Sequence, residues 1–348
     1  MISPMKPLAS LSLDVDNQWS YMKTHGDQGW AKFPSYLELL VPRVLELLDK
    51  HNLKITFFVV GQDAALAGNQ TILEKIADAG HEIGNHSFHH EPWLNTYTPD
   101  EIEAELEAAE SAILAATGVR PCGFRGPGYS FSSTLLHALG RRGYLYDAST
   151  FPTFIGPLAR AYYFLNARLS AEQRQNRKNL FGGLRDGFRP LKPYCWDLNG
   201  TPLLEIPVTT MPILRTPFHL SYILYVAGRA PSVALAYFRT ALQLCRLTSV
   251  QPSLLLHPLD FIGGDDVKGL DFFPAMQLKA RAKIELADRA LATYRELFRG
   301  VPMVEHAQEL IAGGGLNRVN PPREIDGSGA AAYPVEAVAR DMDRQEAA

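Results

Sequence analysis

Cysteine is scarce in this sequence, since the 348 residues contain only Cys122, Cys195 and Cys245. Their odd number and wide, unpatterned spacing exclude a disulfide framework and a zinc knuckle. Few cysteines are typical of proteins kept in a reducing compartment, so the sequence predicts a cytoplasmic protein.

Long apolar runs are also missing. The nearest approach, residues 218–227, is shorter than the roughly 18 residues of a membrane-spanning helix, and residues 1–8 lack the apolar core of a signal peptide. The net charge of -3 gives no support to a role in binding nucleic acid. Hydrophobic content of 46% and charged content of 20% are ordinary for a soluble globular enzyme.

Short apolar runs alternate with segments of helical periodicity, which predicts a parallel sheet with helices packed outside it. We expect strands at 8–15, 54–60, 81–86, 123–125, 145–149, 203–208, 253–257 and near 301, and helices at 35–51, 69–79, 98–117, 132–143, 232–247, 274–298 and up to about 311. This order predicts an α/β fold, a distorted (β/α) barrel of seven or eight mostly parallel strands. It would occupy residues 1–311, with an insertion at about 155–193 and a flexible, disordered tail at 312–348.

Acidic and imidazole side chains end two of the expected strands. Asp14 and Asp16 close the first apolar run, and His86-Ser87-Phe88-His89-His90 follows about seventy residues later. One carboxylate with His86 and His90 makes a facial set of three ligands, which leaves coordination positions for water and substrate. The second aspartate would then lie near the metal as a general base, so the pattern predicts metal-assisted hydrolysis.

Each of these features has a simpler interpretation when taken alone. An Asp-x-Asp pair is more often a helix cap or a turn, and His-x-x-x-His arises frequently by chance. Arg125, before a Gly-Pro-Gly turn, could be an ordinary salt-bridge arginine, and His257 in Leu-Leu-Leu-His-Pro could be a core histidine. Their shared position at strand ends favours one site, because the carboxyl ends of parallel strands meet there. We interpret His89 as a residue that supports the site or faces solvent.

Five motifs occur in order: SLDVD, GHEIGNHSFHH, FRGPGY, LEIPV and LLLHP. Together they resemble the polysaccharide deacetylases with a NodB-type catalytic domain, carbohydrate esterase family 4, in the branch with an Asp-x-Asp first motif. The resemblance covers about residues 8–310 and is interrupted by the insertion.

The resemblance implies a role for each matching position. Asp14 matches the catalytic base and Arg125 the arginine that holds it, while the metal ligands, for zinc (Zn²⁺) or another divalent ion, would be Asp16, His86 and His90. The backbone N–H at Gly128 or Tyr129 matches the oxyanion donor, and His257 matches the general acid.

Two features depart from the family pattern. Many members have adjacent aspartates in the first motif, whereas Val15 separates them here. The aspartate of the fourth motif has no clean counterpart, and Asp197 beside Trp196 is the nearest.

The insertion at 155–193 carries eight Arg and Lys against one Glu and one Asp, interleaved with aromatic and aliphatic side chains. Such a segment suits an anionic lipid headgroup or a sugar-phosphate lipid. Our hypothesis is that the substrate is an N-acetylated sugar on a polyprenyl phosphate, met by peripheral contact with the inner membrane face. The alternatives are a solvated lid over the cleft, a cell-wall glycan or soluble oligosaccharide as substrate, a non-sugar amide, imide or formyl group, or a carbohydrate-binding protein with a relic site.

Overall fold

The computed structural model describes residues 6–158, 160–161, 183–228 and 230–322. Within these residues one sheet runs in the order β10-β6-β7-β5-β4-β3-β2-β1-β8, and β9 pairs with β1. Its strands are β1 (Leu8–Asp14), β2 (Thr56–Val59), β3 (Glu82–Asn85), β4 (Gly123–Phe124), β5 (Tyr146–Asp147), β6 (Tyr194–Leu198), β7 (Thr201–Glu205), β8 (Ser253–Leu256), β9 (Arg299–Val301) and β10 (Arg318–Val319).

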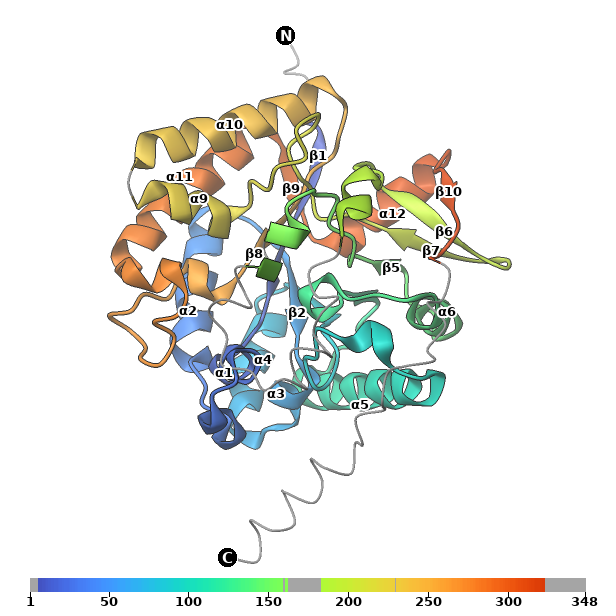
Figure 1. Ribbon diagram of the computed structural model, residues 1–348, viewed down its shortest axis with the longest axis horizontal. Helices are drawn as coiled ribbons and strands as arrows, with labels where there is room; N and C mark the ends of the chain where they lie inside the picture. Colours follow the sequence, from blue (N-terminus) through green and yellow to red (C-terminus); the bar gives the residue numbers. More distant parts are fainter. Residues whose placement is uncertain (1–5, 159, 162–182, 229, 323–348) are drawn as a thin grey trace, which may run out of the picture.

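Helices surround this sheet in Figure 1, with β1 and β2 near the middle of the molecule. They are α1 (Gln18–His25), α2 (Leu37–Lys50), α3 (Gly61–Ala65), α4 (Ala67–Asp78), α5 (Pro99–Thr117), α6 (Ser133–Arg141), α9 (Leu220–Ala227), α10 (Pro231–Leu247), α11 (Ala280–Leu297) and α12 (Met303–Gly313). The predicted α/β fold with mostly parallel strands is confirmed, while closure of the sheet into a barrel stays a prediction.

The predicted strand count of seven or eight is wrong, because the described residues form ten strands. The difference lies mainly in β6, which pairs antiparallel with β7, and in the two-residue strand β10, which pairs with β6. Asn199 and Gly200 join β6 to β7 with positive φ angles of 54° and 101°. An Asn-Gly pair between apolar runs is a strong hairpin signal, so β6 was readable from the sequence.

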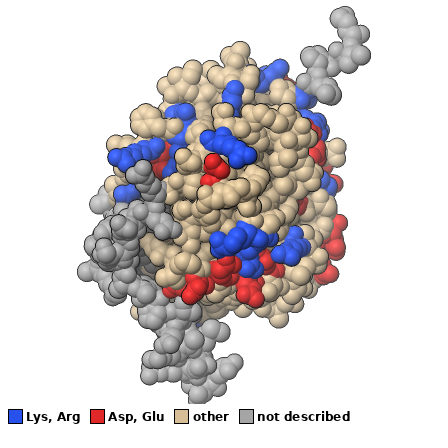
Figure 2. Space-filling model, turned by 90° about the vertical axis from the view of Figure 1, so that its right-hand side faces the viewer, with Lys and Arg blue, Asp and Glu red and all other residues tan. Residues whose placement is uncertain are grey.

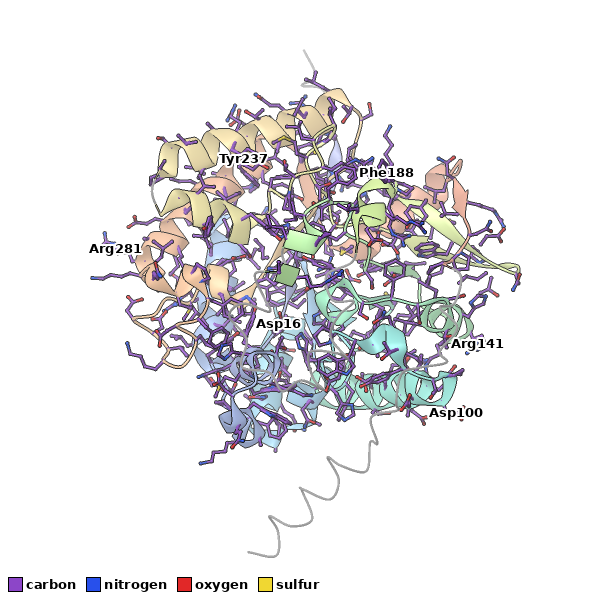
Figure 3. The ribbon with its side chains drawn as sticks, in the orientation of Figure 1. Asp16, Asp100, Arg141, Phe188, Tyr237 and Arg281 are labelled. Carbon is purple, nitrogen blue, oxygen red and sulfur yellow. The ribbon has the colours of Figure 1, made fainter. Side chains whose placement is uncertain are left out.

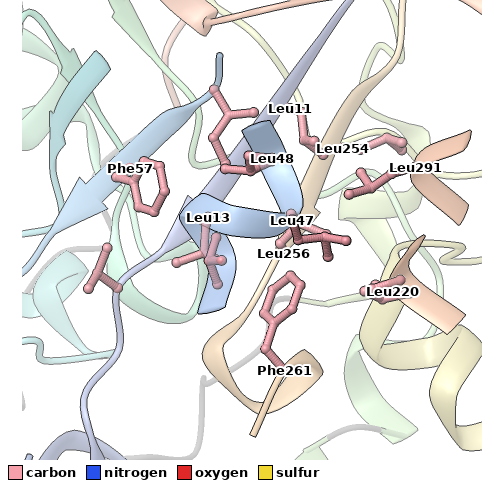
Figure 4. Close-up of a cluster of buried hydrophobic side chains, with 14 of the residues drawn as sticks. Leu11, Leu13, Leu47, Leu48, Phe57, Leu220, Leu254, Leu256, Phe261 and Leu291 are labelled. Carbon is pink, nitrogen blue, oxygen red and sulfur yellow. The ribbon is translucent and has the colours of Figure 1, made fainter. Parts of the chain in front are cut away.

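The central strand β1 is buried along all seven residues. Its leucines pack against β8 and α2, and Figure 4 shows Leu47 and Leu48 close to Leu11 and Leu13. Burying a leucine side chain stabilises a fold by about 1.5–3 kcal/mol. Strand β1 is therefore rigidly held, and it ends at Asp14, the first predicted site residue.

The predicted tail at 312–348 begins with ordered residues, which corrects that boundary. Helix α12 continues to Gly313, and the Cys195 N–H donates to the Asn317 carbonyl at 2.8 Å as β10 joins the sheet. This backbone pairing orders a stretch whose Gly-rich composition gave no strand signal. Residues 323–348 lie outside the described residues.

Most of the predicted insertion, residues 162–182, also lies outside the described residues, and so do most of its basic side chains. The described part includes a 3₁₀ helix, η4 (Leu184–Phe188). In the portion of the chain that the structure describes, no helix combines the length and apolar character needed to cross a membrane.

Candidate metal and catalytic site

The predicted site residues follow the carboxyl ends of neighbouring strands. Leu13 of β1 pairs with Leu256 of β8, so Asp14 and His257 come next on adjacent strands. In the same way Asn85 pairs with Phe124, and His86 and Arg125 follow them. Figure 3 places Asp16 near the middle of the molecule, whereas Asp100, Arg141 and Arg281 lie at its periphery.

Asp16, His86 and His90 converge in a buried cluster. The Oδ1 atom of Asp16 lies 2.9 Å from Nε2 of His90 and 3.3 Å from Nε2 of His86. One ligand atom from each residue lies within 4.8 Å of the others. Two imidazole nitrogens and one carboxylate oxygen are a donor set that fits zinc and other divalent ions, so these three residues could bind a metal.

The backbone orients the imidazole of His86 and places His90 in an unusual turn. Nδ1 of His86 lies 2.7 Å from the Arg125 carbonyl, so it donates there and leaves Nε2 as the ligand atom. The turn that carries His90 has unusual backbone geometry, with φ angles of 62° at Ser87 and 55° at His90. Non-glycine residues rarely adopt such angles except where the surroundings impose them, as at many functional sites.

The electrostatics of this cluster favour charged side chains despite its burial. Burial acts to raise the pKa of Asp16, but His90 and His86 outweigh it and hold that pKa well below its ordinary value. Burial acts to lower the pKa of His86, but Asp14 and Asp16 reverse the sign and raise it. The opposite charges of Asp16 and His86 thus offset the cost of burying them.

Asp14 has a different environment from Asp16. The Arg125 guanidinium donates to Oδ1 of Asp14 at 2.6 Å, and Oδ2 of Asp14 lies 3.8 Å from Nε2 of His86. Arg125 is fully buried and is fixed by the carbonyl of Ala148 at 3.1 Å and the ring of Phe58 at 4.3 Å. The two aspartates therefore differ in their main partners, since Asp16 lies against two imidazoles and Asp14 binds a guanidinium. The expected division of roles requires such a difference.

Gly128 and Tyr129 lie in the 3₁₀ turn η3 (Pro127–Tyr129) beyond Arg125. The Tyr129 N–H already donates to the Gly126 carbonyl at 3.0 Å, which favours Gly128 as the oxyanion donor of the two. The turn is anchored at Gly126, whose N–H donates to Ser149 Oγ at 2.8 Å.

His257 is supported by two residues that the sequence analysis missed. Its Nδ1 lies 3.0 Å from Ser221 Oγ, and Ser221 donates to Asp260 Oδ1 at 2.8 Å. Because the hydroxyl hydrogen points to Asp260, the Ser221 oxygen accepts from Nδ1–H and leaves Nε2 of His257 for another partner. Asp260 lies three residues after His257, so the sequence could have indicated it as a partner. Nothing in the sequence indicates Ser221.

The candidate for the fourth motif, Asp197, is placed elsewhere. Its carboxylate is about half exposed on β6 and lies 3.5 Å from Arg318. His89 also lies outside the ligand set, since its Nδ1 lies 2.6 Å from Glu105 Oε2. Glu105 accepts the His89 N–H as well, at 2.7 Å, and so ties this turn to α5.

A second pair of buried carboxyl groups lies behind the turn at Gly126. Asp147 and Glu205 are cross-strand partners at the ends of β5 and β7, and both are fully buried. Ser149 donates to Asp147 Oδ1 at 2.5 Å, while Trp196 Nε1 donates to Glu205 Oε2 at 2.9 Å. Burial raises the pKa of both carboxyl groups, most strongly that of Glu205, which favours a proton shared between the two.

The sequence profile of the polysaccharide deacetylases matches residues 27–146, a range that includes His86, His90 and Arg125. Residues 27–146 are thus similar to a polysaccharide deacetylase domain. The resemblance to carbohydrate esterase family 4 that the ordered motifs predicted is confirmed.

Two bacterial proteins illustrate the extent of the likeness in sequence. The Bacillus subtilis peptidoglycan-N-acetylmuramic acid deacetylase PdaA is 38% identical over 104 residues, which cover 30% of this chain and 38% of PdaA. The Helicobacter pylori peptidoglycan deacetylase is 33% identical over 112 residues, covering 32% and 37% of the two chains. The matched segment thus spans less than two fifths of the length of these relatives.

Solved structures share the fold over nearly the whole chain. A Mycobacterium smegmatis protein assigned as a polysaccharide deacetylase is 21% identical, with a TM-score of 0.60 and coverage of 92% of this chain and 95% of that one. PuuE allantoinase is 15% identical, with a TM-score of 0.56 and coverage of 90% and 92%. These likenesses show the shared fold.

Proposed function

We propose that this chain is a metal-dependent hydrolase that removes the N-acetyl group of an amino sugar in a cell-envelope glycan or its lipid-linked precursor. One observation carries the proposal. The carboxylate of Asp14 is held by Arg125 at 2.6 Å and lies 3.8 Å from His86, beside a buried Asp-His-His set. A base next to three metal ligands is the arrangement that amide hydrolysis needs.

Asp16, His86 and His90 would hold the metal, and zinc is our expectation for a set of two imidazoles and one carboxylate. A divalent ion bound there would polarise the acyl oxygen and lower the pKa of its bound water.

The other residues would carry out the proton transfers and hold the substrate. Asp14 takes a proton from the attacking water, and Arg125 keeps this carboxylate aimed at the water. The Gly128 N–H donates to the oxygen that gains negative charge. His257 protonates the leaving amine, with Ser221 and Asp260 holding its ring and stabilising its charged form.

The substrate assignment rests on two observations. The relatives matched in sequence include peptidoglycan deacetylases, which act on N-acetylated glycans. The basic composition of residues 155–193 suits a phosphate-bearing lipid carrier, so we propose a polyprenyl-phosphate-linked sugar met at the cytoplasmic face of the inner membrane.

The test combines metal analysis of the purified chain with release of acetate and formate from a substrate panel. The panel contains lipid-linked N-acetylglucosamine, chitooligosaccharides, peptidoglycan fragments and allantoin as a non-sugar amide. We expect stoichiometric metal and acetate release from an amino sugar, lost in Asp14→Asn and retained in Asp197→Asn, the matched control on β6. Ring opening of allantoin to allantoate, with no acetate or formate released from any sugar, would replace the sugar with another amide, and a purified chain without metal would contradict the hydrolase.

A further inference from the structure

Exposed apolar side chains are concentrated in one part of the molecule. Among the described residues, fifteen large apolar side chains are exposed, and nine of them fall within residues 154–158, 184–188 and 213–226. Scattered single apolar residues are normal on a protein surface, whereas a cluster indicates a binding surface.

Ring contacts and hydrogen bonds join these segments into a single surface. The rings of Phe154 and Phe188 lie 5.0 Å apart in an edge-on arrangement. Thr153 Oγ1 donates to the Arg215 carbonyl at 2.8 Å, and Arg215 Nη1 donates to the Arg189 carbonyl at 2.8 Å. We define the apolar rim as the exposed side chains that these contacts hold together: Phe154, Leu184, Phe188, Ile213 and Leu214.

The most exposed side chains of the rim lie in segments that contacts with the rest of the fold hold in place. Phe188 is 79% exposed and Ile213 is 77% exposed, in two different segments. Ile213 has a φ of 73°, which is costly for a β-branched residue. Its turn is closed by a bridge between Thr210 and Pro217, and Tyr237 of α10 donates to the Pro217 carbonyl at 2.9 Å. The fold thus maintains a strained turn that exposes two aliphatic side chains to water.

The charges beside the rim are mostly positive. Arg185, Arg189, Lys192 and Arg215 lie in its segments, and Asp186 is the acidic residue among them. Elsewhere charges alternate, and in the lower part of the face shown in Figure 2 basic and acidic side chains lie next to each other. Arg141 and Arg142, for example, pair with Glu103 at 2.7 and 3.0 Å. The rim therefore has an excess of positive charge that attracts anions.

Aromatic contacts connect the rim region to the catalytic residues. Phe151 stacks on Tyr129 with ring centroids 4.6 Å apart and lies 5.4 Å from His219. The ring of His219 is 6.0 Å from that of His257. A ligand that reaches the site along this side would pass next to the apolar rim.

We propose that the apolar rim docks this protein onto an anionic lipid bilayer, with the rim side chains entering the interface and the arginines facing lipid phosphates. Aromatic and aliphatic side chains flanked by arginines are the chemistry of interfacial binding, and anionic lipids add to it. This surface deepens the proposed function because it would bring a lipid-linked sugar to the site, yet docking itself requires no turnover.

Vesicle co-sedimentation of the full chain tests the docking. Vesicles of phosphatidylcholine with phosphatidylglycerol should bind the protein, and vesicles of phosphatidylcholine alone should bind it much more weakly. Phe188→Ser with Ile213→Ser, and separately Arg185→Glu, should each weaken partitioning by about tenfold or more. The matched control is Leu247→Ser, since Leu247 is 81% exposed at the end of α10, which precedes the amino end of β8, opposite the site. It should bind as the unmodified chain does.

Failure of this inference is distinguishable from failure of the proposed function. The Asp14→Asn variant should bind anionic vesicles normally. If the unmodified chain binds vesicles but releases no acetate, only the proposed hydrolase activity is contradicted. Equal binding to both kinds of vesicle, no binding, or normal binding by the Phe188 and Ile213 variant would overturn the docking surface. Sedimentation velocity tests whether a second copy of the chain covers the rim instead. A dimer that these substitutions dissociate would assign the rim to that second copy and would overturn docking on lipid.

Discussion

Two pairs of buried carboxyl groups end strands of the same sheet, and they have opposite electrostatic states. Asp14 and Asp16 lie against one guanidinium and two imidazoles. Asp147 and Glu205 lie against neutral donors, the hydroxyl groups of Ser149 and Thr150 and the indole of Trp196.

The difference shows that burial alone does not determine what a carboxyl group can do. Burial acts to raise the pKa of Asp16 and of Glu205 alike, but His90 and His86 hold the pKa of Asp16 well below its ordinary value, and that of Glu205 stays well above it. A carboxylate that keeps its charge can bind a metal, whereas a carboxyl that keeps its proton can only donate or accept hydrogen bonds.

The largest effect is expected at the charged pair. Asp14→Asn removes the base and leaves the ligand set in place, so the variant should bind metal and lose turnover by about 10²–10⁴-fold or more. His86→Ala removes a ligand and should lose both metal and turnover. Metal analysis and acetate release, measured on the same preparations, distinguish the two variants. Full activity in Asp14→Asn would show that the base lies elsewhere.

Arg125→Met tests how much the buried cation stabilises the charged pair. It leaves Asp14 without its partner in an enclosed site, so the free energy of unfolding of the metal-free protein should fall by about 3–5 kcal/mol. Arg141→Met is the matched control, because Arg141 pairs with Glu103 at the surface and should cost about 1 kcal/mol or less. Denaturant unfolding measures both, and equal losses would contradict the special role of the buried pair.

Much of the fold was predictable because its signals are local. The start of α5 is an example: Thr98 and Glu101 form a capping box at the predicted start of this helix, with the Thr98 N–H donating to Glu101 Oε2 at 2.8 Å. The apolar run of β1 and the helical spacing of α2 were equally direct. Asp14, Asp16, His86 and His90 were found because charged and imidazole groups at the ends of apolar strands need partners.

The remaining parts depend on contacts between segments that are distant in sequence. Ser221 reaches His257 from α9, thirty-six residues earlier in the chain, and no local pattern marks it. Glu205 was quoted within a motif, but its pairing with Asp147 depends on the register of β5 against β7. Strand β10 has two residues and exists only through its pairing with β6. Propensity cannot predict structure that tertiary pairing creates.

The response of metal binding to pH gives a smaller and more specific test of the charged pair. Asp14 and Asp16 raise the pKa of His86, so in the metal-free protein His86 keeps a proton to higher pH than usual. A metal must displace that proton, and its affinity should therefore fall as the pH falls, by about tenfold per pH unit for each proton released. Calorimetry in buffers of different ionisation enthalpy counts these protons. Asp14→Asn should release fewer at the same pH, and release of none by the unmodified chain would contradict the charge assignment.

The smallest effect is expected for Asp147→Asn at the proton-sharing pair. Oδ1 of Asp147 accepts from Ser149, whereas Oδ2 is buried with no hydrogen-bond partner among the described residues other than the carboxyl group it faces. In Asp147→Asn, an amide N–H placed at the position of Oδ2 would donate to Glu205 as the shared proton does. The free energy of unfolding of this variant at neutral pH should therefore stay within about 1 kcal/mol of that of the unmodified chain, whereas Asp147→Ala should lose about 1–3 kcal/mol.

The pH dependence of unfolding distinguishes the shared proton from a pair of ionised groups. Unfolded Glu205 releases its proton near its ordinary pKa of 4.5, while the folded residue keeps it to higher pH. The folded state therefore binds more protons in that window, and stability falls as the pH rises through it. Asp147→Asn should flatten this decline because the amide replaces the proton. An Asn variant that lost as much stability as the Ala variant, and that kept the same decline of stability with pH, would contradict the proton shared between these two carboxyl groups.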